Sequence, residues 1–265
     1  MLTAAQLEEF ERRGWTTVPD AVSPADRVVM FDRVWEFLEK RGLLRDDPST
    51  WPDSIDKLQP LRKAGAFDAF LGPLIDSTAD QLIGAGRWTT LGVRPQALIT
   101  LPTAEPWCLP HKVWHLDLPG KGLPSGIPAV RYFGLLDDVE PRGGGTLVVE
   151  GSHELVAQMV AAAPRNDAGS SSELRKKLRS HEFFSRLADP DPDISRFMET
   201  GDEIDGVPVR VAEVTGRAGD LIVMHPWMMH NLSMNCSTRP RIAMTYSLYT
   251  TERSLYGGSD SRAAD

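Results

Sequence analysis

Short runs of β-prone residues follow one another from about residue 88 to residue 250, separated by glycine, proline and aspartate. They predict strands at Gln96–Leu101, Val113–Leu118, Val130–Leu136, Thr146–Val149, Val207–Val214, Leu221–Met224 and Ile242–Tyr249. Several short strands with such turns are typical of a sandwich or barrel rather than of a parallel sheet. We therefore expect a mainly β fold with flanking α-helices.

Helical patterns precede and interrupt these strands. They predict helices after Thr3, after Ser23-Pro24, over Phe67–Ile83, over Glu154–Ala163 and over Ser171–Leu187. The Asp-Pro-Asp-Pro sequence within Asp189–Gly206 favours a loop there.

The chain has 265 residues, which is enough for one large core, and we expect a single domain over 1–265. In this interpretation residues 1–87 form a mainly helical part that packs on a strand-rich core over 88–250. A lid is expected near 167–206, and the polar segment 257–265 is expected to be disordered.

The charge balance argues against broad attraction to nucleic acid or anionic lipid. Lys plus Arg number 29 and Asp plus Glu number 37, which gives a formal charge of −8. No apolar stretch is long enough to predict a membrane span or a signal peptide. The two cysteines, Cys108 and Cys236, are too few for a disulfide scaffold, so a cytoplasmic location is expected.

One of the six histidines, His115, lies two residues before a carboxylate, that of Asp117. In a strand, His115 and Asp117 would point to the same face and could hold one ion together. Two histidines and a carboxylate form the facial triad of non-haem Fe(II) sites, and the spacing alone allows either His225 or His230 as the third ligand. Downstream, Arg241 would point into a sheet interior, where it needs an anionic partner.

Taken together, these motifs resemble the phytanoyl-CoA dioxygenase family of Fe(II)/2-oxoglutarate oxygenases. The resemblance is carried by His115-x-Asp117, Gly143-Gly144-Gly145-Thr146, Gly151-Ser152-His153, Gly219-Asp220, His225-Pro226, His230, Asn235 and Arg241. It covers about residues 90–250 and implies a double-stranded β-helix, the jelly-roll or cupin-like core.

The resemblance also implies roles for individual residues. His115, Asp117 and His230 would bind Fe(II) and form the catalytic centre, because the family places its distal histidine eleven residues before the arginine. Arg241 would bind 2-oxoglutarate. Gln96 and Thr100, on one face of a predicted strand, are further candidates for 2-oxoglutarate contacts. Candidates for substrate contact are His111, Trp227, His225 and Arg131.

The activity that follows is a dioxygenase reaction that consumes O2 and 2-oxoglutarate, releases succinate and CO2 and hydroxylates an unactivated C–H bond, with ascorbate as a supporting reductant. Related halogenases replace the carboxylate ligand by a small residue, so Asp117 favours hydroxylation. Desaturation, epoxidation and ring formation are alternatives with the same cofactors.

The expected substrate is a small molecule, in the setting of natural-product biosynthesis. Two classes of protein compete with this interpretation. One is a non-catalytic cupin-like module that binds a metal or small ligand, and the other is a metal-assisted hydrolase, which leaves Arg241 unexplained. Nothing in the sequence distinguishes a monomer from an oligomer.

Overall fold

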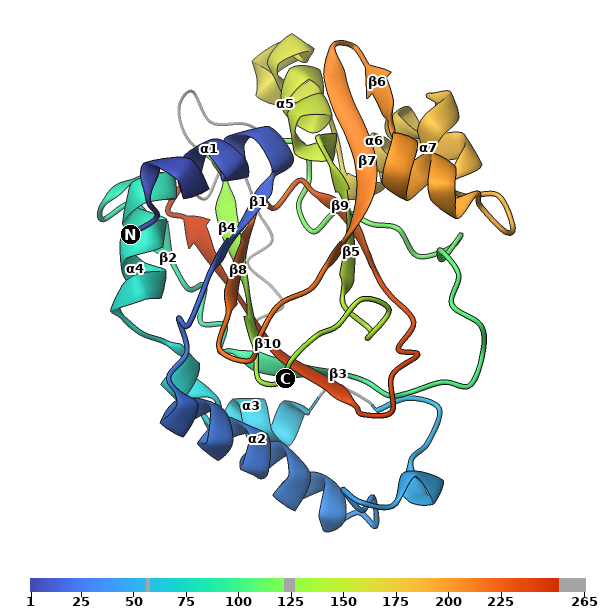
Figure 1. Ribbon diagram of the computed structural model, residues 1–265. Coiled ribbons are helices and arrows are strands. Elements are labelled where there is room, and N and C mark those ends of the chain that lie inside the picture. Colours follow the sequence, from blue (N-terminus) through green and yellow to red (C-terminus); the bar gives the residue numbers. More distant parts are fainter. Residues whose placement is uncertain (56–57, 122–126, 253–265) are drawn as a thin grey trace.

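The computed structural model describes residues 1–55, 58–121 and 127–252, and two antiparallel sheets form its centre (Figure 1). The strands are β1 (Trp15–Val18), β2 (Trp88–Thr89), β3 (Gln96–Thr100), β4 (Ala129–Leu135), β5 (Thr146–Glu150), β6 (Asp202–Ile204), β7 (Val207–Val214), β8 (Leu221–Met224), β9 (Met229–Leu232) and β10 (Arg241–Thr250). The helices are α1 (Ala4–Arg13), α2 (Pro24–Glu39), α3 (Gln59–Lys63), α4 (Pro73–Ala79), α5 (Ser152–Ala162), α6 (Ser171–Leu178) and α7 (Glu182–Arg186).

The larger sheet has the order β1-β8-β4-β10-β2, and β3 also pairs with β10. The smaller sheet has the order β6-β7-β5-β9. Apart from the consecutive strands β6 and β7, the neighbours along each sheet are not consecutive in the chain, as in a jelly roll. The mainly β, jelly-roll class expected from the sequence is confirmed.

Alternation along β10 assigns its two faces. Ile242, Met244 and Tyr246 belong to an apolar core shared with α1, α2 and α4, whereas Ala243 belongs to a core between the two sheets. The two sets of side chains therefore lie on opposite faces of β10. A third core joins the smaller sheet to α5, α6 and α7.

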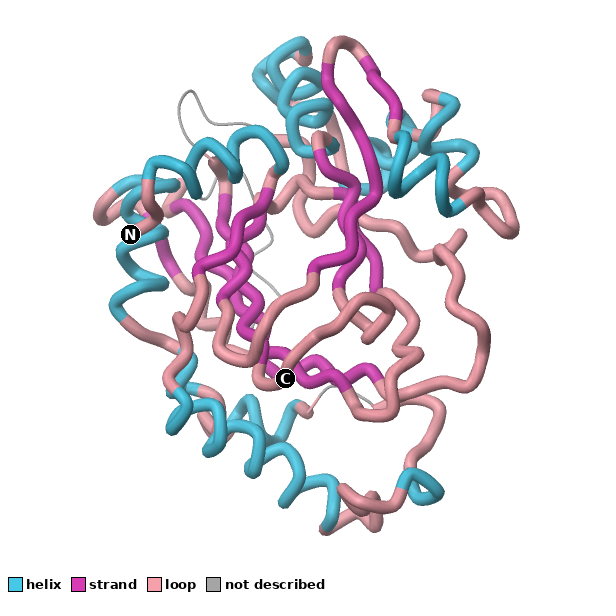
Figure 2. Tube along the Cα trace, viewed as in Figure 1, coloured by secondary structure: helices cyan, strands magenta, loops and turns pink. Residues whose placement is uncertain are grey.

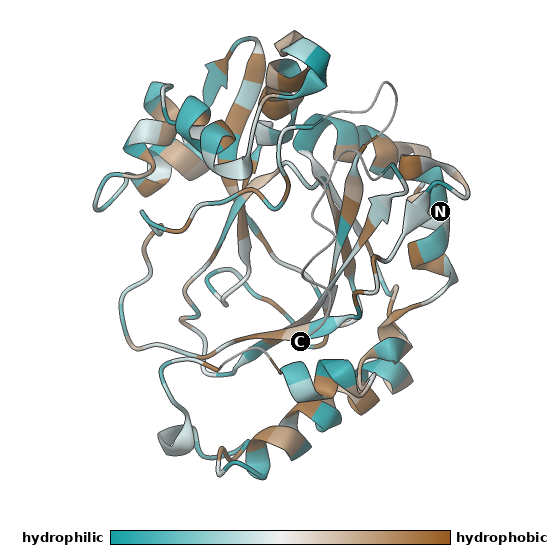
Figure 3. Cartoon of the chain, turned by 180° about the vertical axis from the view of Figure 1, so that it is seen from behind, coloured by the Kyte–Doolittle hydropathy of each residue, from teal (hydrophilic) through white to brown (hydrophobic). Residues whose placement is uncertain are grey.

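The amino-terminal helices cover the outer face of the larger sheet (Figures 1 and 2). The expected capping box is present at Thr3, and Gly14 ends α1 in the left-handed region. In α2, Met30, Val34 and Leu38 are buried on one side, and Figure 3 shows hydrophilic residues alternating with hydrophobic ones along the helices below the sheet.

Three local predictions were wrong. Val113–Leu118 is not a strand, since its only ladder contact in the described chain is an isolated bridge at His115. The helix expected over Phe67–Ile83 is interrupted by an extended Gly72 and restarts at Pro73. The loop expected over Asp189–Gly206 contains a π-helical turn, Arg196–Thr200, and strand β6.

The helix predicted over Ser171–Leu187 is also divided. His181 has extended backbone angles, which separates α6 from α7. The expected disordered tail, 257–265, lies outside the described residues. Within the described ranges, no helix is long and apolar enough to cross a membrane.

Candidate metal centre

His115, Asp117 and His230 lie together at the inner side of the larger sheet. One potential ligand atom from each lies within 4.8 Å of the others. His115 Nε2 is 4.0 Å from Asp117 Oδ1, and His230 Nε2 is 3.7 Å from Asp117 Oδ2. The geometry thus brings His230, and not His225, beside the His115-x-Asp117 pair.

Backbone pairing sets the two imidazoles side by side. His115 and His230 form an antiparallel bridge, in which each backbone N–H donates to the carbonyl oxygen of the other at 3.0–3.1 Å. Residues opposite each other in such a bridge present their side chains on one face. Their ring centroids are accordingly 4.1 Å apart.

Each of these histidines also has its second ring nitrogen occupied by the backbone. His115 Nδ1 lies 2.9 Å from the Val113 carbonyl oxygen, and His230 Nδ1 lies 2.9 Å from that of Met228. A carbonyl oxygen can accept a hydrogen bond but not donate one, so the Nδ1 of each ring must carry the proton. Each ring thereby keeps the lone pair of its Nε2 for a ligand. Burial, opposed by the attraction of Asp117, lowers the pKa of His230 to about 4.

A strained residue supplies one of these carbonyls. Val113 has φ 67, a left-handed conformation that is unusual for a β-branched side chain. The preceding carbonyl, of Lys112, accepts a hydrogen bond from Asn231 Nδ2 at 2.6 Å. The turn before His115 is therefore tied to the residue that follows His230.

Asp117 also faces a cation. Arg131 Nη1 of β4 lies 3.0 Å from Asp117 Oδ2, although the contact lacks hydrogen-bond alignment. Arg131 and Asp117 are both largely buried, with side chains 22% and 19% exposed. Their opposite charges stabilise each other in this setting.

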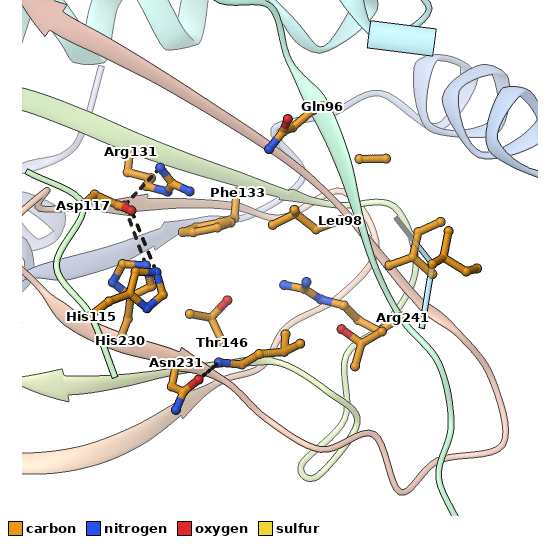
Figure 4. Close-up of a pocket in the computed structure, with 15 residues that line it drawn as sticks. Gln96, Leu98, His115, Asp117, Arg131, Phe133, Thr146, His230, Asn231 and Arg241 are labelled. Carbon is orange, nitrogen blue, oxygen red and sulfur yellow. Dashed lines mark hydrogen bonds and ion pairs between the residues drawn. The ribbon is translucent and has the colours of Figure 1, made fainter. Parts of the chain in front are cut away.

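A cavity of about 370 Å³ opens from the triad along the inner face of the larger sheet (Figure 4). This volume is typical of a small-molecule site. Its lining consists of Ile55, Gln96, Ala97, Leu98, Ile99, Thr100, His115, Asp117, Arg131, Phe133, Thr146, His230, Asn231, Leu232 and Arg241.

Arg241 lies on the opposite side of this cavity from the triad, with its guanidinium directed inward (Figure 4). The residue is 4% exposed, and its Nε and Nη1 have no hydrogen-bond partner among the described residues. Burial lowers its pKa to about 10. The Thr100 and Thr245 hydroxyls nearby on the paired strands are likewise unpartnered.

The residues present fit a divalent metal together with a dianionic ligand. Two imidazole nitrogens and one carboxylate form a donor set that leaves open positions on a metal such as Fe(II). The buried, unpartnered guanidinium demands an anion, and a carboxylate matches its fork geometry. A ligand that reaches from the triad to Arg241 would satisfy both requirements.

The other predicted site residues divide into two groups. Gln96 and Thr100 line the cavity, and register pairs Thr100 with Arg241 and Gln96 with Thr245. His111, His225 and Trp227 are not among its lining residues.

The neighbours of His225 and Trp227 explain this separation. The His225 ring packs on Phe10 of α1 and on His153, and its Nδ1 accepts a hydrogen bond from the Trp227 backbone. Trp227 Nε1 donates to the Pro119 carbonyl.

Several lining residues were missed by sequence reasoning. Phe133 shares a face of β4 with Arg131, and Thr146 begins β5 opposite Leu232. Period-two alternation from Arg131 would have found Phe133. Alternation from His230 would likewise have found Leu232, whereas Asn231 projects from the other face of β9 and lacks such a signal.

Comparison with known proteins gives a family and a fold. The family model described as phytanoyl-CoA dioxygenase (PhyH) matches residues 10–243. HygX from Streptomyces hygroscopicus, crystallised with nickel and 2-oxoglutarate bound, has a TM-score of 0.53 and 17% identity over 95% of this chain and 88% of its own. No curated protein sequence matches the chain.

Two proteins of nogalamycin chemistry have the same fold. The epimerase SnoN, in complex with Fe3+, alpha ketoglutarate and nogalamycin RO, has a TM-score of 0.55 and 14% identity over 98% of this chain and 91% of its own. SnoK, a non-heme alpha ketoglutarate dependent carbocyclase from nogalamycin biosynthesis, has a TM-score of 0.52 and 16% identity over 94% and 84%. At these identities the likeness concerns the fold.

Proposed function

Because the chain belongs to the phytanoyl-CoA dioxygenase family, we propose that it is an Fe(II)- and 2-oxoglutarate-dependent dioxygenase that hydroxylates a small molecule. One observation carries the proposal. A His-Asp-His cluster and a buried, unpartnered Arg241 lie at opposite sides of one cavity. A metal-assisted hydrolase leaves a buried cation at that place unexplained.

His115, Asp117 and His230 would hold Fe(II), each histidine through Nε2. Arg241 would pair with the far carboxylate of 2-oxoglutarate, with the Thr100 and Thr245 hydroxyls as added donors and Gln96 at the end of β3. When bound, iron, 2-oxoglutarate and O2 supply an oxidant that removes hydrogen from an unactivated C–H bond, with release of succinate and CO2.

The chain's own residues prepare this chemistry. Leu98 and Phe133 form an apolar wall between the triad and Arg241, which excludes water from the cosubstrate. The backbone carbonyls of Val113 and Met228 fix the protonation and the direction of the two imidazoles. The Arg131 guanidinium lies next to the carboxylate of Asp117 and balances its charge.

Hydroxylation is the proposed outcome, since Asp117 retains the carboxylate that related halogenases lack. Proteins named as an epimerase and a carbocyclase share this fold. Desaturation, epoxidation and ring formation therefore stay as alternatives with the same cofactors. The setting of SnoK and SnoN in nogalamycin biosynthesis supports the proposal that this chain acts in natural-product biosynthesis.

Two further predictions stay proposals. The cytoplasm is the proposed location, in keeping with the free thiols of Cys108 and Cys236. A lid over 167–206 is also kept as a prediction. The described cavity lining contains no residue of that segment, and Leu174, Phe183 and Phe197 of it are packed in the third core.

The test is anaerobic addition of 2-oxoglutarate to the Fe(II)-loaded protein. We expect a weak charge-transfer absorption, and succinate release once air and a substrate panel are added. His230→Gln should abolish the absorption, whereas His225→Gln, equally buried but away from the cavity, should retain it. The reverse pattern, or no absorption in the unmodified protein, would refute the assignment.

A further inference from the structure

Arg131 lies beside Asp117 at the triad end of the cavity, far from Arg241 (Figure 4), and the proposed cosubstrate does not use it. Its Nη1 faces Asp117, whereas its Nε has no hydrogen-bond partner within the described ranges. The guanidinium therefore has hydrogen-bonding capacity beyond its contact with the carboxylate.

A second cavity, of about 80 Å³, adjoins the first at these same two residues. Both cavities are lined by Asp117 and Arg131, and the second is otherwise lined by Leu118, Ala129, Val130, Pro226, Ser247 and Tyr249. It is formed where the start of β4, the end of β10 and the chain after β8 meet the segment that follows Asp117. The two cavities thus lie on either side of the Asp117–Arg131 pair.

Strand register brings polar groups into this second cavity. Ser247 of β10 pairs with Arg131 of β4, and Tyr249 pairs with Ala129. Paired residues project on the same face of a sheet, so the two hydroxyl-bearing side chains stand on the side of the Arg131 guanidinium. A guanidinium flanked by hydroxyl groups is a donor set for an anion.

The volume limits what the second cavity accepts. One water needs about 10–15 Å³ on this measure, and whole small-molecule sites span about 300–1,000 Å³. A space of about 80 Å³ therefore holds a group of a few non-hydrogen atoms, such as a carboxylate with its neighbouring carbon. The phosphates and the base of a coenzyme A thioester do not fit it.

Charge balance favours the same occupant. Among the described residues lining the two cavities, the charged groups besides the histidines are Arg131, Arg241 and Asp117. A divalent metal and a doubly charged 2-oxoglutarate cancel each other, which leaves the site with one positive charge. An unbalanced buried charge is costly, and a single anionic group would remove that cost.

We infer that the second cavity binds the carboxylate of the primary substrate, with Arg131 and Ser247 as its contacts. The inference rests on the proposed function and narrows its substrate class to free monocarboxylic acids rather than thioesters. Because Arg131 also contacts Asp117, the carbon to be oxidised lies within a few bonds of that carboxylate. The rest of the substrate extends into the larger cavity, past Leu98 and Leu232.

The inference is tested on the full chain loaded with Mn(II) and saturated with 2-oxoglutarate, using acetate as the probe. The paramagnetic metal shortens the relaxation time of acetate methyl protons bound nearby. We expect this effect for acetate and not for acetamide, a neutral probe of the same shape. Arg131→Met should weaken acetate binding at least about tenfold, with partial recovery in Arg131→Lys.

A second variant separates binding from disturbance of the metal. Ser247→Ala should weaken acetate binding about threefold to tenfold with unchanged Mn(II) affinity, and the exposed Arg239→Met should change neither. Equal relaxation of acetate and acetamide, no relaxation of either, or full acetate binding in both Arg131→Met and Ser247→Ala would overturn the inference. Titration of 2-oxoglutarate in the same samples reports on the proposed function separately, since its failure to bind would refute that function instead.

Discussion

Replacing Arg241 by methionine should make the ligand-free protein more stable while weakening 2-oxoglutarate binding. The guanidinium is buried, and its Nε and Nη1 lack partners in the described chain. Burial lowers its pKa from the usual value of an arginine to about 10, which corresponds to about 3 kcal/mol against the charged form. Methionine fills similar space without charge, so we expect the free energy of unfolding to rise by up to about 3 kcal/mol.

The buried charge of Arg241 destabilises the folded protein at neutral pH. Arg241 stays protonated in the folded protein below pH 10, so the cost of its charge is fully present at pH 7. That cost is relieved only as the pH rises through about 10. Urea unfolding of the metal-free protein at pH 7 therefore measures it directly.

Ligand binding should reduce the difference in stability between the two proteins. Truncating one side of a buried charge pair costs about 2–5 kcal/mol, or at least about 30-fold in the dissociation constant of 2-oxoglutarate. At about 100 times the unmodified dissociation constant, 2-oxoglutarate adds about 2.7 kcal/mol to the metal-loaded protein. The same concentration should add less than about 1 kcal/mol to Arg241→Met.

The matched control is Arg239→Met, two residues earlier on the chain. Its side chain is 65% exposed, and it pairs with Asp137 at 3.6 Å. We expect Arg239→Met to change the free energy of unfolding by less than about 1 kcal/mol, both without and with 2-oxoglutarate. A ligand-free Arg241→Met that is no more stable than the unmodified protein would refute the reasoning from burial, and equal stabilisation of both by 2-oxoglutarate would remove Arg241 from that site.

Three further predictions concern the triad and the segments that support it. Asp117→Ala should weaken Co(II) binding by more than about 100-fold, because loss of an outer-shell partner alone costs 10–100-fold; spectroscopic titration checks this, and an unchanged affinity would contradict it. Val113→Gly should raise the free energy of unfolding by up to about 1 kcal/mol by relieving the left-handed strain at φ 67, whereas Lys112→Gly should lower it in the same urea titration. Burial lowers the pKa of His225 and of His153 below the usual 6.5, so the unfolded chain takes up more protons and the free energy of unfolding should fall as the pH drops below about 6.5; His225→Asn should flatten that dependence between pH 7 and 5, and an unchanged slope would contradict it.

The strands were predictable because their residues alternate between two environments. In β10, Ile242, Met244 and Tyr246 face the helices, whereas Arg241, on the opposite face, lines the cavity. The expected strand at Val207–Val214 has the bounds of β7. Local pattern suffices where each face of a strand meets a uniform neighbour.

The segment around His115 shows where local pattern fails. It alternates like a strand, but Val113 adopts a left-handed conformation that leaves its side chain 73% exposed. The conformation depends on Asn231, which holds the Lys112 carbonyl, and on the bridge to His230. Both partners come from β9, and no short-range signal reports such a distant pairing.

His225 and Trp227 were expected near the substrate because they lie close to His230 in sequence. The chain turns between β8 and β9, so the residues of the turn project toward α1 and the Pro119 carbonyl rather than into the cavity. Closeness to His230 along the chain therefore does not place these two side chains in the cavity, because they belong to the turn and not to β9. The family spacing to Arg241 pointed to His230, which lies in the cluster with His115 and Asp117.

Arg131 and Arg241 show what the sequence does convey about chemistry. Each is the single charged residue of its strand, and β4 and β10 pair directly, so both side chains reach one interior. Burying an arginine costs several kcal/mol unless an anion pairs with it. A buried arginine therefore indicates a nearby anion even when that anion has not been identified. The structure distinguishes the two cases. Arg131 meets Asp117 of its own chain and keeps an unpartnered Nε, whereas neither Nε nor Nη1 of Arg241 meets an acceptor in the described residues. Arg241 therefore depends entirely on an anion from solution, whereas Arg131 shares its charge between Asp117 and a ligand.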